Sequence, residues 1–174
     1  LTTLRTALEG LHRRLRRNTK GGSRRNIAEH YDLGNEFYAL WLDRQMMYSS
    51  AIWESDEMTL EEAQHARLER ICAKLELSPS DHLVELGSGW GSMAVHAASK
   101  YGCRVTTTTI SREQHELTAR RVRDAGLADR VEVLMQDYRD LTGSYDKLVS
   151  LEMIEAVGAD YFESYFQQVG SLLK

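Results

Sequence analysis

Three glycines at alternate positions, Gly87, Gly89 and Gly91, give this sequence its clearest chemical signal. They follow an apolar run at His82–Leu86, which is typical of a buried strand, and they precede a helix-forming stretch at residues 93–100. A strand, a glycine turn and a helix in this order bring backbone N–H groups close to a bound ligand. Glycine is needed where a side chain would block that ligand or where φ must be positive.

The spacing of these glycines helps to decide which of two kinds of ligand the turn binds. A dinucleotide fingerprint, G-x-G-x-x-G, would have its third glycine at position 92, which is Ser92. The dinucleotide pattern also has an acid about 20 residues further on, and Arg104–Arg112 contains no acid. The combination favours a turn that binds S-adenosylmethionine over one that binds NAD.

Length and composition limit the rest of the interpretation. The 174 residues, 42% of them hydrophobic and only one a proline, correspond to one domain of an ordinary globular protein. No apolar run approaches the ~20 residues that span a bilayer, and no signal-peptide pattern is present. Cys72 and Cys103 lie in apolar segments without metal-ligand spacing, so we expect reduced core thiols in a cytosolic protein and no metal site.

The charges are unevenly distributed along the chain. The chain has 22 Lys and Arg and 26 Asp and Glu, of which residues 1–25 hold eight basic residues and one acid. The rest therefore has 14 basic and 25 acidic residues, a formal net charge of −11. Leu4, Leu8, Leu11 and Leu15 form one apolar stripe among the arginines. A basic amphipathic helix of this kind is typical of a membrane-surface element. Packing on a neighbouring domain is an equally weighted alternative, and the stretch from Asn18 to Ser23 is expected to be a linker.

A second segment, residues 26–53, interleaves aromatic and polar side chains too densely for a surface helix. Several of them could line a pocket: His30, Tyr31, Asp32, Asn35, Tyr48, Ser49 and Ser50. The pattern alone favours the simpler alternative, a capping helix whose aromatic side chains only fill the core. A capping box at Thr59–Glu62 then predicts a helix to about Leu75, with an inward face made of Leu60, Leu68, Ile71, Cys72 and Leu75.

Strand and helix patterns alternate through the remainder of the chain. Strands are predicted at residues 103–110, 129–136 and 146–152, with one helix from a second capping box, Ser111–Gln114, and another at residues 161–173. This alternation predicts an α/β fold with a Rossmann-like parallel sheet, whose ligands bind beyond the carboxyl ends of the strands. The expected domains are residues 1–25, a helical cap at 26–80, and a cofactor-binding part at 81–174.

The chain has no initiator Met and stops within a helical pattern, and the 93 residues from His82 onward are few for a complete doubly wound sheet. We therefore expect a fragment that lacks the C-terminal strands.

Six ordered motifs resemble the cyclopropane-fatty-acid synthase family, which includes the mycolic-acid methyltransferases. The resemblance covers residue 26 to the end and is carried by His30-Tyr-Asp-Leu-Gly-Asn35, Tyr48-Ser-Ser-Ala51, Leu86-Gly-Ser-Gly-Trp-Gly91, Thr109-Ile-Ser-Arg-Glu-Gln114, Gln136-Asp-Tyr-Arg-Asp140 and Ser150-Leu-Glu-Met-Ile-Glu-Ala-Val-Gly158. It implies a class I methyltransferase fold and S-adenosylmethionine as methyl donor. The implied substrate is an acyl chain with a cis double bond, commonly on a membrane phospholipid.

The same resemblance implies the cofactor-binding residues. The methionine end would lie near Tyr48, Ser49 and the glycine turn, the ribose near the second strand, and the adenine after the third. The full set is Tyr48, Ser49, Glu85, Gly87, Ser88, Gly89, Gly91, Thr109, Ile110, Gln114, Asp137, Tyr138 and Leu151. Gln114 also has a purely structural explanation, as the N3 residue of a capping box.

The expected chemistry is methyl attack on the double bond, followed by removal of a proton from the added methyl group. In the family a bound bicarbonate is thought to act as this base, and the resemblance implies that the backbone N–H of Ser50 and the side chain of Glu155 would hold it. The familiar Glu-His pair reads Glu155-Ala156 here, which leaves a methyl- or methylene-branched product open beside the cyclopropane. A salt-bridged structural role is the alternative for Glu155.

The expected partners are unsaturated phospholipid acyl chains and an anionic membrane surface, without nucleic acid, and a homodimer is left open. The expected location is cytoplasmic and peripheral at the membrane. Two other classes of function remain: a methyltransferase for a small soluble acceptor, and a non-catalytic fragment that only binds the cofactor.

Overall fold

One parallel sheet forms the centre of the molecule. The computed structural model describes Thr19, residues 21–23 and residues 34–174. Its strands are β1 (His82–Leu86), β2 (Arg104–Thr109), β3 (Val131–Met135) and β4 (Lys147–Ser150), in the spatial order β3-β2-β1-β4. Every pairing is parallel, with Val84 of β1 opposite Thr106 and Leu148. The α/β prediction is confirmed. The chain runs outward from β1 through β2 to β3 and then returns to add β4 on the other side of β1, so the strand order reverses between β1 and β4.

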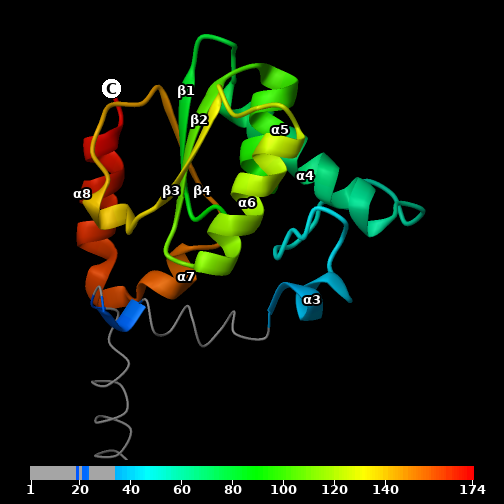
Figure 1. The fold of residues 1–174 in the computed structure, drawn as a ribbon, viewed down its shortest axis with the longest axis horizontal. Coiled ribbons are helices and arrows are strands. Elements are labelled where there is room, and N and C mark those ends of the chain that lie inside the picture. Colours follow the sequence, from blue (N-terminus) through cyan, green and yellow to red (C-terminus); the bar gives the residue numbers. More distant parts are fainter. Residues whose placement is uncertain (1–18, 20, 24–33) are drawn as a thin grey trace, which may run out of the picture.

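Helices cover both faces of this sheet (Figure 1). The helices α5 (Ser92–Tyr101) and α6 (Arg112–Asp124) lie on one face, and α8 (Phe162–Leu172) lies on the other. Short helices α7 (Ile154–Val157), η1 (Tyr138–Asp140) and η2 (Ala159–Tyr161) connect the strands to α8. Before the sheet, α3 (Gly34–Ala39) and α4 (Leu60–Leu75) flank the cap segment, an irregular stretch of turns and bends at residues 42–59. Of the described residues, none belongs to a helix long and apolar enough to cross a membrane.

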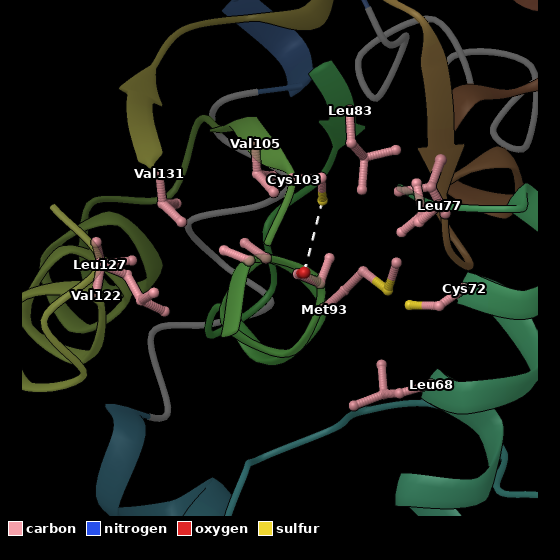
Figure 2. Close-up of a cluster of buried hydrophobic side chains, with 14 of the residues drawn as sticks. Leu68, Cys72, Leu77, Leu83, Met93, Cys103, Val105, Val122, Leu127 and Val131 are labelled. Atoms are coloured by element: carbon pink, nitrogen blue, oxygen red, sulfur yellow. Dashed lines mark hydrogen bonds between the residues drawn. The ribbon is translucent and has the colours of Figure 1, made fainter. Parts of the chain in front are cut away.

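Two apolar clusters hold the helices to the sheet. Alternate residues of β1 divide between them, because successive strand residues point to opposite faces: Leu83 packs with α4, α5 and α6, whereas Val84 and Leu86 pack with α8. Figure 2 shows Cys72 and Cys103 within the first cluster, among leucine and valine side chains. Both thiols are free and buried, as predicted, and burial raises the pKa of Cys72 to about 12.

The ends of α4 agree with the sequence prediction, but one residue of its inward face does not. Thr59 and Glu62 form both hydrogen bonds of the capping box. Leu68 and Cys72 are fully buried, whereas Leu60 is exposed because the first turn of α4 extends beyond the molecule's core. The prediction that Leu60 faces inward is therefore wrong.

Two further predictions need correction. The fourth strand ends at Ser150 instead of residue 152, because Glu152 has a left-handed backbone (φ +50) that cannot continue a strand. Gly21–Ser23, predicted as part of a linker, is a helical turn, in which the Ser23 N–H donates to the Thr19 carbonyl at 2.7 Å. The basic helix at residues 1–17 and three predicted pocket residues, His30, Tyr31 and Asp32, lie outside the described residues.

Candidate functional site

A pocket of about 220 Å³ lies beyond the carboxyl ends of the strands. Its walls come from the turn after β1, the ends of β2 and β3, the loop after β4 with the short helix α7, and the cap segment. Twelve of the residues that the sequence assigned to a cofactor line it: Tyr48, Ser49, Glu85, Gly87, Ser88, Gly89, Thr109, Ile110, Gln114, Asp137, Tyr138 and Leu151. This is the position at which open parallel sheets bind ligands.

The glycine turn presents open backbone to this pocket. Gly87, Gly89 and Gly91 all have positive φ, at +87, +50 and +90. The Gly87 and Ser88 N–H groups donate to the Thr108 carbonyl of β2 at 3.0 and 2.9 Å, which fixes the start of the turn. A side chain at Gly89 would meet no atom within 4 Å, so this glycine leaves open space where a ligand could approach the backbone.

Gly91 has a different role from the other two. It is absent from the pocket wall and is the N-cap of α5. A Cβ at this position would lie 2.8 Å from Cγ2 of Thr118 in α6, closer than atoms can pack. The third glycine therefore allows α6 to pack against the turn, and the prediction that it lines the cofactor site is not supported by its position.

The end of β2 is organised around Gln114. Ser111 accepts a hydrogen bond from the Gln114 N–H at 3.3 Å, as an N-cap should. The Gln114 side chain does not complete the predicted capping box. Its Oε1 instead accepts from the Thr109 hydroxyl at 2.9 Å, and Thr109 Oγ1 accepts from the Ser111 N–H at 3.1 Å. The amide is therefore held beside Thr109 in the pocket wall, where it could also bind a ligand.

Glu85 lies within β1 and is almost completely buried. Thr107 on the neighbouring strand donates its hydroxyl proton to Glu85 Oε2 at 2.6 Å. Burial raises the pKa of Glu85 to about 8, although the Thr107 hydrogen bond lowers it. Glu85 is therefore protonated in the folded protein at neutral pH.

Asp137 and Tyr138 follow β3, the edge strand on the side of the sheet away from β4. Asp137 is buried, and Arg139 donates to both of its carboxylate oxygens, from Nε at 2.8 Å and from Nη2 at 2.6 Å. Arg139 Nη2 also donates to Ser23 Oγ at 3.3 Å. Ser23 and Arg139 both line the pocket, so the helical turn at residues 21–23 contributes to this wall.

Hydrogen bonds from α6 and α4 hold the cap segment in place, and those from α6 also join it to the glycine turn. Arg121 of α6 donates from Nη1 to the Gln45 carbonyl at 2.6 Å and to the Trp90 carbonyl at 2.9 Å. Gln64 of α4 donates to the Ser49 carbonyl at 2.7 Å. Tyr38 packs against Trp90, with ring centroids 5.0 Å apart. Some cap aromatics therefore fill a core, as the simpler alternative expected, while Tyr48 lines the pocket.

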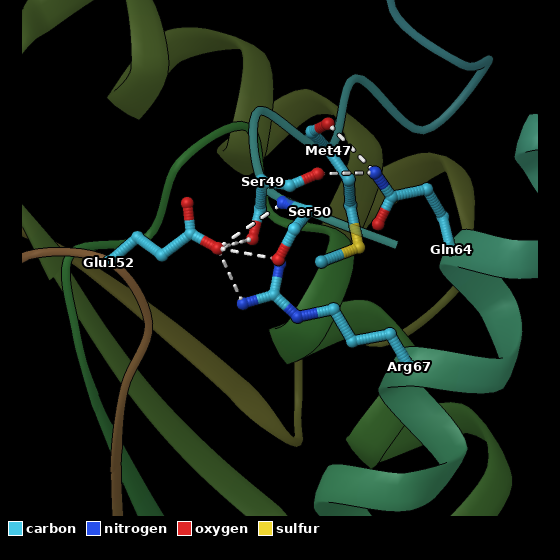
Figure 3. Close-up of polar contacts among 6 residues, drawn as sticks. All are labelled: Met47, Ser49, Ser50, Gln64, Arg67 and Glu152. Atoms are coloured by element: carbon cyan, nitrogen blue, oxygen red, sulfur yellow. Dashed lines mark hydrogen bonds and ion pairs between the residues drawn. The ribbon is translucent and has the colours of Figure 1, made fainter. Parts of the chain in front are cut away.

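Glu152 is the functional candidate that the sequence reasoning missed. Its Oε1 accepts from the Ser49 hydroxyl at 2.6 Å, from the Ser50 N–H at 3.2 Å and from Arg67 Nη2 at 2.9 Å (Figure 3). These partners come from the cap and from α4, so Glu152 joins both to the sheet. An acid at the carboxyl end of a strand could have been noticed in the sequence, but Glu152 was assigned to the strand itself.

The two predicted catalytic residues lie outside the pocket wall. Ser50 is exposed, and its N–H, which the resemblance assigned to bicarbonate, donates to Glu152. Glu155 is in α7 and is exposed. Its neighbours Met153, Ala156 and Val157 line the pocket.

One group of potential metal ligands is found in the described part of the chain, on α4 and α5 away from the pocket. His65, Glu69 and His96 place their ligand atoms within 4.8 Å of one another. Lys100 Nζ lies 2.7 Å from Glu69 Oε1, as does His96 Nε2. Because an ammonium group already neutralises the carboxylate, an ion pair between two helices accounts for the charge of this cluster.

Comparison with known proteins shows the family of this chain and agrees with its fold. The family model described as mycolic acid cyclopropane synthetase matches residues 18–174. A probable fatty acid methyltransferase of Pseudomonas putida is 42% identical over 82% of this chain. The cyclopropane-fatty-acyl-phospholipid synthase of Escherichia coli K12 is 44% identical over 84% of it. The chain spans about 37% of the length of either relative.

Solved structures show the same similarity. The crystal structure of the mycolic acid cyclopropane synthase CmaA1, complexed with SAH and CTAB, matches with a TM-score of 0.83 and 32% identity. The cyclopropane synthase MmaA2 from Mycobacterium tuberculosis matches with a TM-score of 0.83 and 30% identity. Each alignment covers 87% of this chain and 53% of the other.

Proposed function

We propose that this chain, which belongs to the mycolic acid cyclopropane synthetase family, forms the cofactor-binding part of a methyltransferase that uses S-adenosylmethionine. The observation that carries the proposal is the open backbone at Gly89, in a pocket where the ends of all four strands and the cap segment meet. The related structure of CmaA1 was solved with SAH, the demethylated form of this cofactor. When bound, the cofactor supplies an electrophilic methyl group on a sulfonium centre.

The residues of the pocket fit the separate parts of such a cofactor. Backbone at Gly87 and Gly89, with Ser49 and Tyr48 of the cap, would hold the methionine end. Thr109 and Gln114 present a hydroxyl and an amide that could bind ribose hydroxyls. At the far end, the ring of Tyr138 offers a flat apolar surface for the adenine, beside Asp137.

We extend the proposal to the acceptor, the cis double bond of an unsaturated acyl chain on a phospholipid. The names of relatives at 42 and 44% identity, a fatty acid methyltransferase and a cyclopropane-fatty-acyl-phospholipid synthase, support this class of substrate. An alkene is a weak nucleophile, so its reaction requires alignment in a pocket that excludes water. A cyclopropane and a methylene-branched chain are alternative products, since they differ only in the fate of the same cation.

Replacement of Gly89 tests the cofactor assignment. A valine at this position would fill the open space beside the backbone and would disfavour the left-handed conformation (φ +50). Gly89→Val should therefore abolish binding of S-adenosylhomocysteine in isothermal calorimetry, while circular dichroism shows the secondary structure retained.

Gly126→Val is the matched control, because Gly126 also has a positive φ (+68) and open surroundings but is absent from the pocket wall. Wild-type affinity in Gly89→Val would overturn the cofactor assignment. Loss of binding in both variants would show a general effect of backbone strain and would overturn it as well.

A further inference from the structure

The polar cluster between α4 and α5 lies away from the pocket and has no part in the function proposed above. His65 and Glu69 are one turn apart on α4, and His96 meets them from α5. The two imidazole rings lie edge to face, with their centroids 5.1 Å apart. The ligand atoms of the three side chains all lie within 4.8 Å of one another. Two imidazoles and one carboxylate therefore meet in a small volume between the helices.

The ion pair with Lys100 accounts for the charge of Glu69 but not for the imidazole of His96. The His96 side chain is nine-tenths buried, and its Nε2 lies 2.7 Å from Glu69 Oε1. This contact lacks the direction of a hydrogen bond, so among the described residues His96 Nε2 has no hydrogen-bond partner. A buried polar atom left in this way is destabilising unless a further group binds it.

The charge states of these side chains suit metal ligands. Burial lowers the pKa of His96, although the charge of Glu69 acts in the opposite direction, so the ring is neutral at neutral pH and keeps a lone pair. Contact with the Lys100 ammonium group holds the pKa of Glu69 below its usual value. The Tyr101 hydroxyl donates to Glu69 Oε2 at 3.2 Å. It thereby orients the carboxylate, as the outer partners of metal ligands do.

An open groove gives ions access to the cluster. The groove has a volume of about 900 Å³ and is lined by His65 and by charged residues that are mostly acidic: Glu54, Glu57, Glu62, Glu69 and Arg70. An excess of negative charge raises the local concentration of cations. Lys100 is half-exposed, so its flexible side chain can move into solvent when a stronger cation arrives.

We propose that His65, Glu69 and His96 bind a divalent transition-metal ion such as Zn²⁺, which displaces the Lys100 ammonium group. Two imidazole nitrogens and one carboxylate oxygen are a ligand set typical of Zn²⁺, with bonds of ~2.0–2.2 Å. In a tetrahedral site with such bonds, the ligand atoms are roughly 3.3 Å apart. Glu69 Oε1 lies 2.7 Å from His96 Nε2 and 3.7 Å from His65 Nε2, distances on either side of this value. A water molecule from the groove completes the coordination.

The ion fastens α4 to α5. Helix α4 also holds the cap segment, through the hydrogen bonds of Gln64 and Arg67, and α5 begins directly after the glycine turn. Metal binding therefore joins the support of the cap to the support of the turn without contact with the pocket. Because the ion binds the folded chain, it should raise the midpoint of thermal unfolding.

The experiment titrates the full chain, untagged and treated with a chelator, with Zn²⁺ in a calorimeter. The wild type should bind a single Zn²⁺ ion. Co²⁺ in its place should show the strong visible absorption of a tetrahedral site, which the hydrated ion lacks. His65→Ala removes a half-exposed ligand without leaving a cavity. It should weaken Zn²⁺ binding ~10²-fold or more, since loss of an outer partner alone costs ~10–100-fold.

Lys100→Met separates a metal site from a simple ion pair. Removal of the competing ammonium group should raise the Zn²⁺ affinity ~2–5-fold, in line with the small contribution of an exposed ion pair. His115→Gln is the matched control, because this histidine of α6 lies outside the cluster. It should keep the wild-type affinity and the wild-type rise in unfolding temperature with Zn²⁺.

Three results would overturn the proposal. The first is wild-type Zn²⁺ affinity in His65→Ala, and the second is an unchanged or lower affinity in Lys100→Met. The third is binding of Ca²⁺ as tight as that of Zn²⁺, because Ca²⁺ takes oxygen ligands and would report only the acidic groove. The same preparations bind or fail to bind S-adenosylhomocysteine independently of these results, so the proposed function is tested separately.

Discussion

At the scale of single residues, the buried carboxyl of Glu85 should make stability depend on pH. Its folded pKa, about 8, is raised above the value near 4.5 of an exposed glutamate. The folded state therefore holds this proton more tightly than the unfolded state does. Its stabilising contribution is complete below the unfolded pKa and is lost as the pH rises through the folded pKa.

We therefore expect the contribution of Glu85 to the free energy of unfolding to fall between pH 5 and pH 8, by ~4 kcal/mol at most, since one pKa unit corresponds to ~1.4 kcal/mol. In Glu85→Gln this decline should be much smaller, because the amide does not titrate and its oxygen can still accept from Thr107. Urea unfolding at both pH values measures the difference. Glu132→Gln on β3, an exposed strand carboxylate, is the control for the loss of a carboxylate from the sheet. An unchanged slope in Glu85→Gln would contradict the assignment of the titration to Glu85.

At the scale of elements, α6 connects the cap to the glycine turn through one side chain. Arg121 donates to carbonyl oxygens of Arg44, Gln45 and Trp90, and so bridges the cap segment and the turn after β1. Hydrogen bonds to a charged donor contribute ~1.5–3 kcal/mol each. Because the cap segment forms one wall of the pocket, its attachment should also affect ligand affinity.

Arg121→Met should lower the free energy of unfolding by ~2 kcal/mol and weaken S-adenosylhomocysteine binding ~10-fold, a change of 1.4 kcal/mol. Thermal unfolding and calorimetry give the two values. Arg123→Met, two residues further along α6 and exposed, is the control and should change neither. If Arg121→Met loses stability but keeps its affinity, the bridge supports the fold without organising the site.

At the scale of the whole molecule, the basic segment at residues 1–25 contrasts with the net charge of −11 on the remainder. The substrate class proposed above is a membrane lipid, and the leucine stripe with its arginines predicts contact with an anionic membrane. Each basic residue near such a surface contributes ~1 kcal/mol, and salt weakens this attraction.

Deletion of residues 1–17 should therefore abolish co-sedimentation with vesicles that contain anionic phospholipid. In the intact chain, binding should decrease as the salt concentration rises. Vesicles of neutral phospholipid serve as the control, because they remove the charge while keeping the bilayer. Full binding by the deletion variant would show that another surface carries the contact. The cap exposes Trp41 and Trp53, which would be the first candidates.

The sequence determined the sheet through local patterns and most of the pocket lining through the family resemblance. Apolar runs, capping residues and glycine spacing predicted β1, β2, β3 and their helices to within about two residues, and the carboxyl ends of parallel strands must meet at one edge. Twelve of the fifteen site residues that the family resemblance implied line the pocket.

The tertiary structure decided the remaining roles because they depend on contacts between distant residues. Gly91 is required by Thr118, which lies 27 positions further along the chain and packs against the turn. Glu152 meets Ser49 and Arg67 across 103 and 85 positions, and a strand pattern cannot reveal that its backbone is left-handed. Only the packing of the cap and α4 against the sheet brings this carboxylate into the pocket.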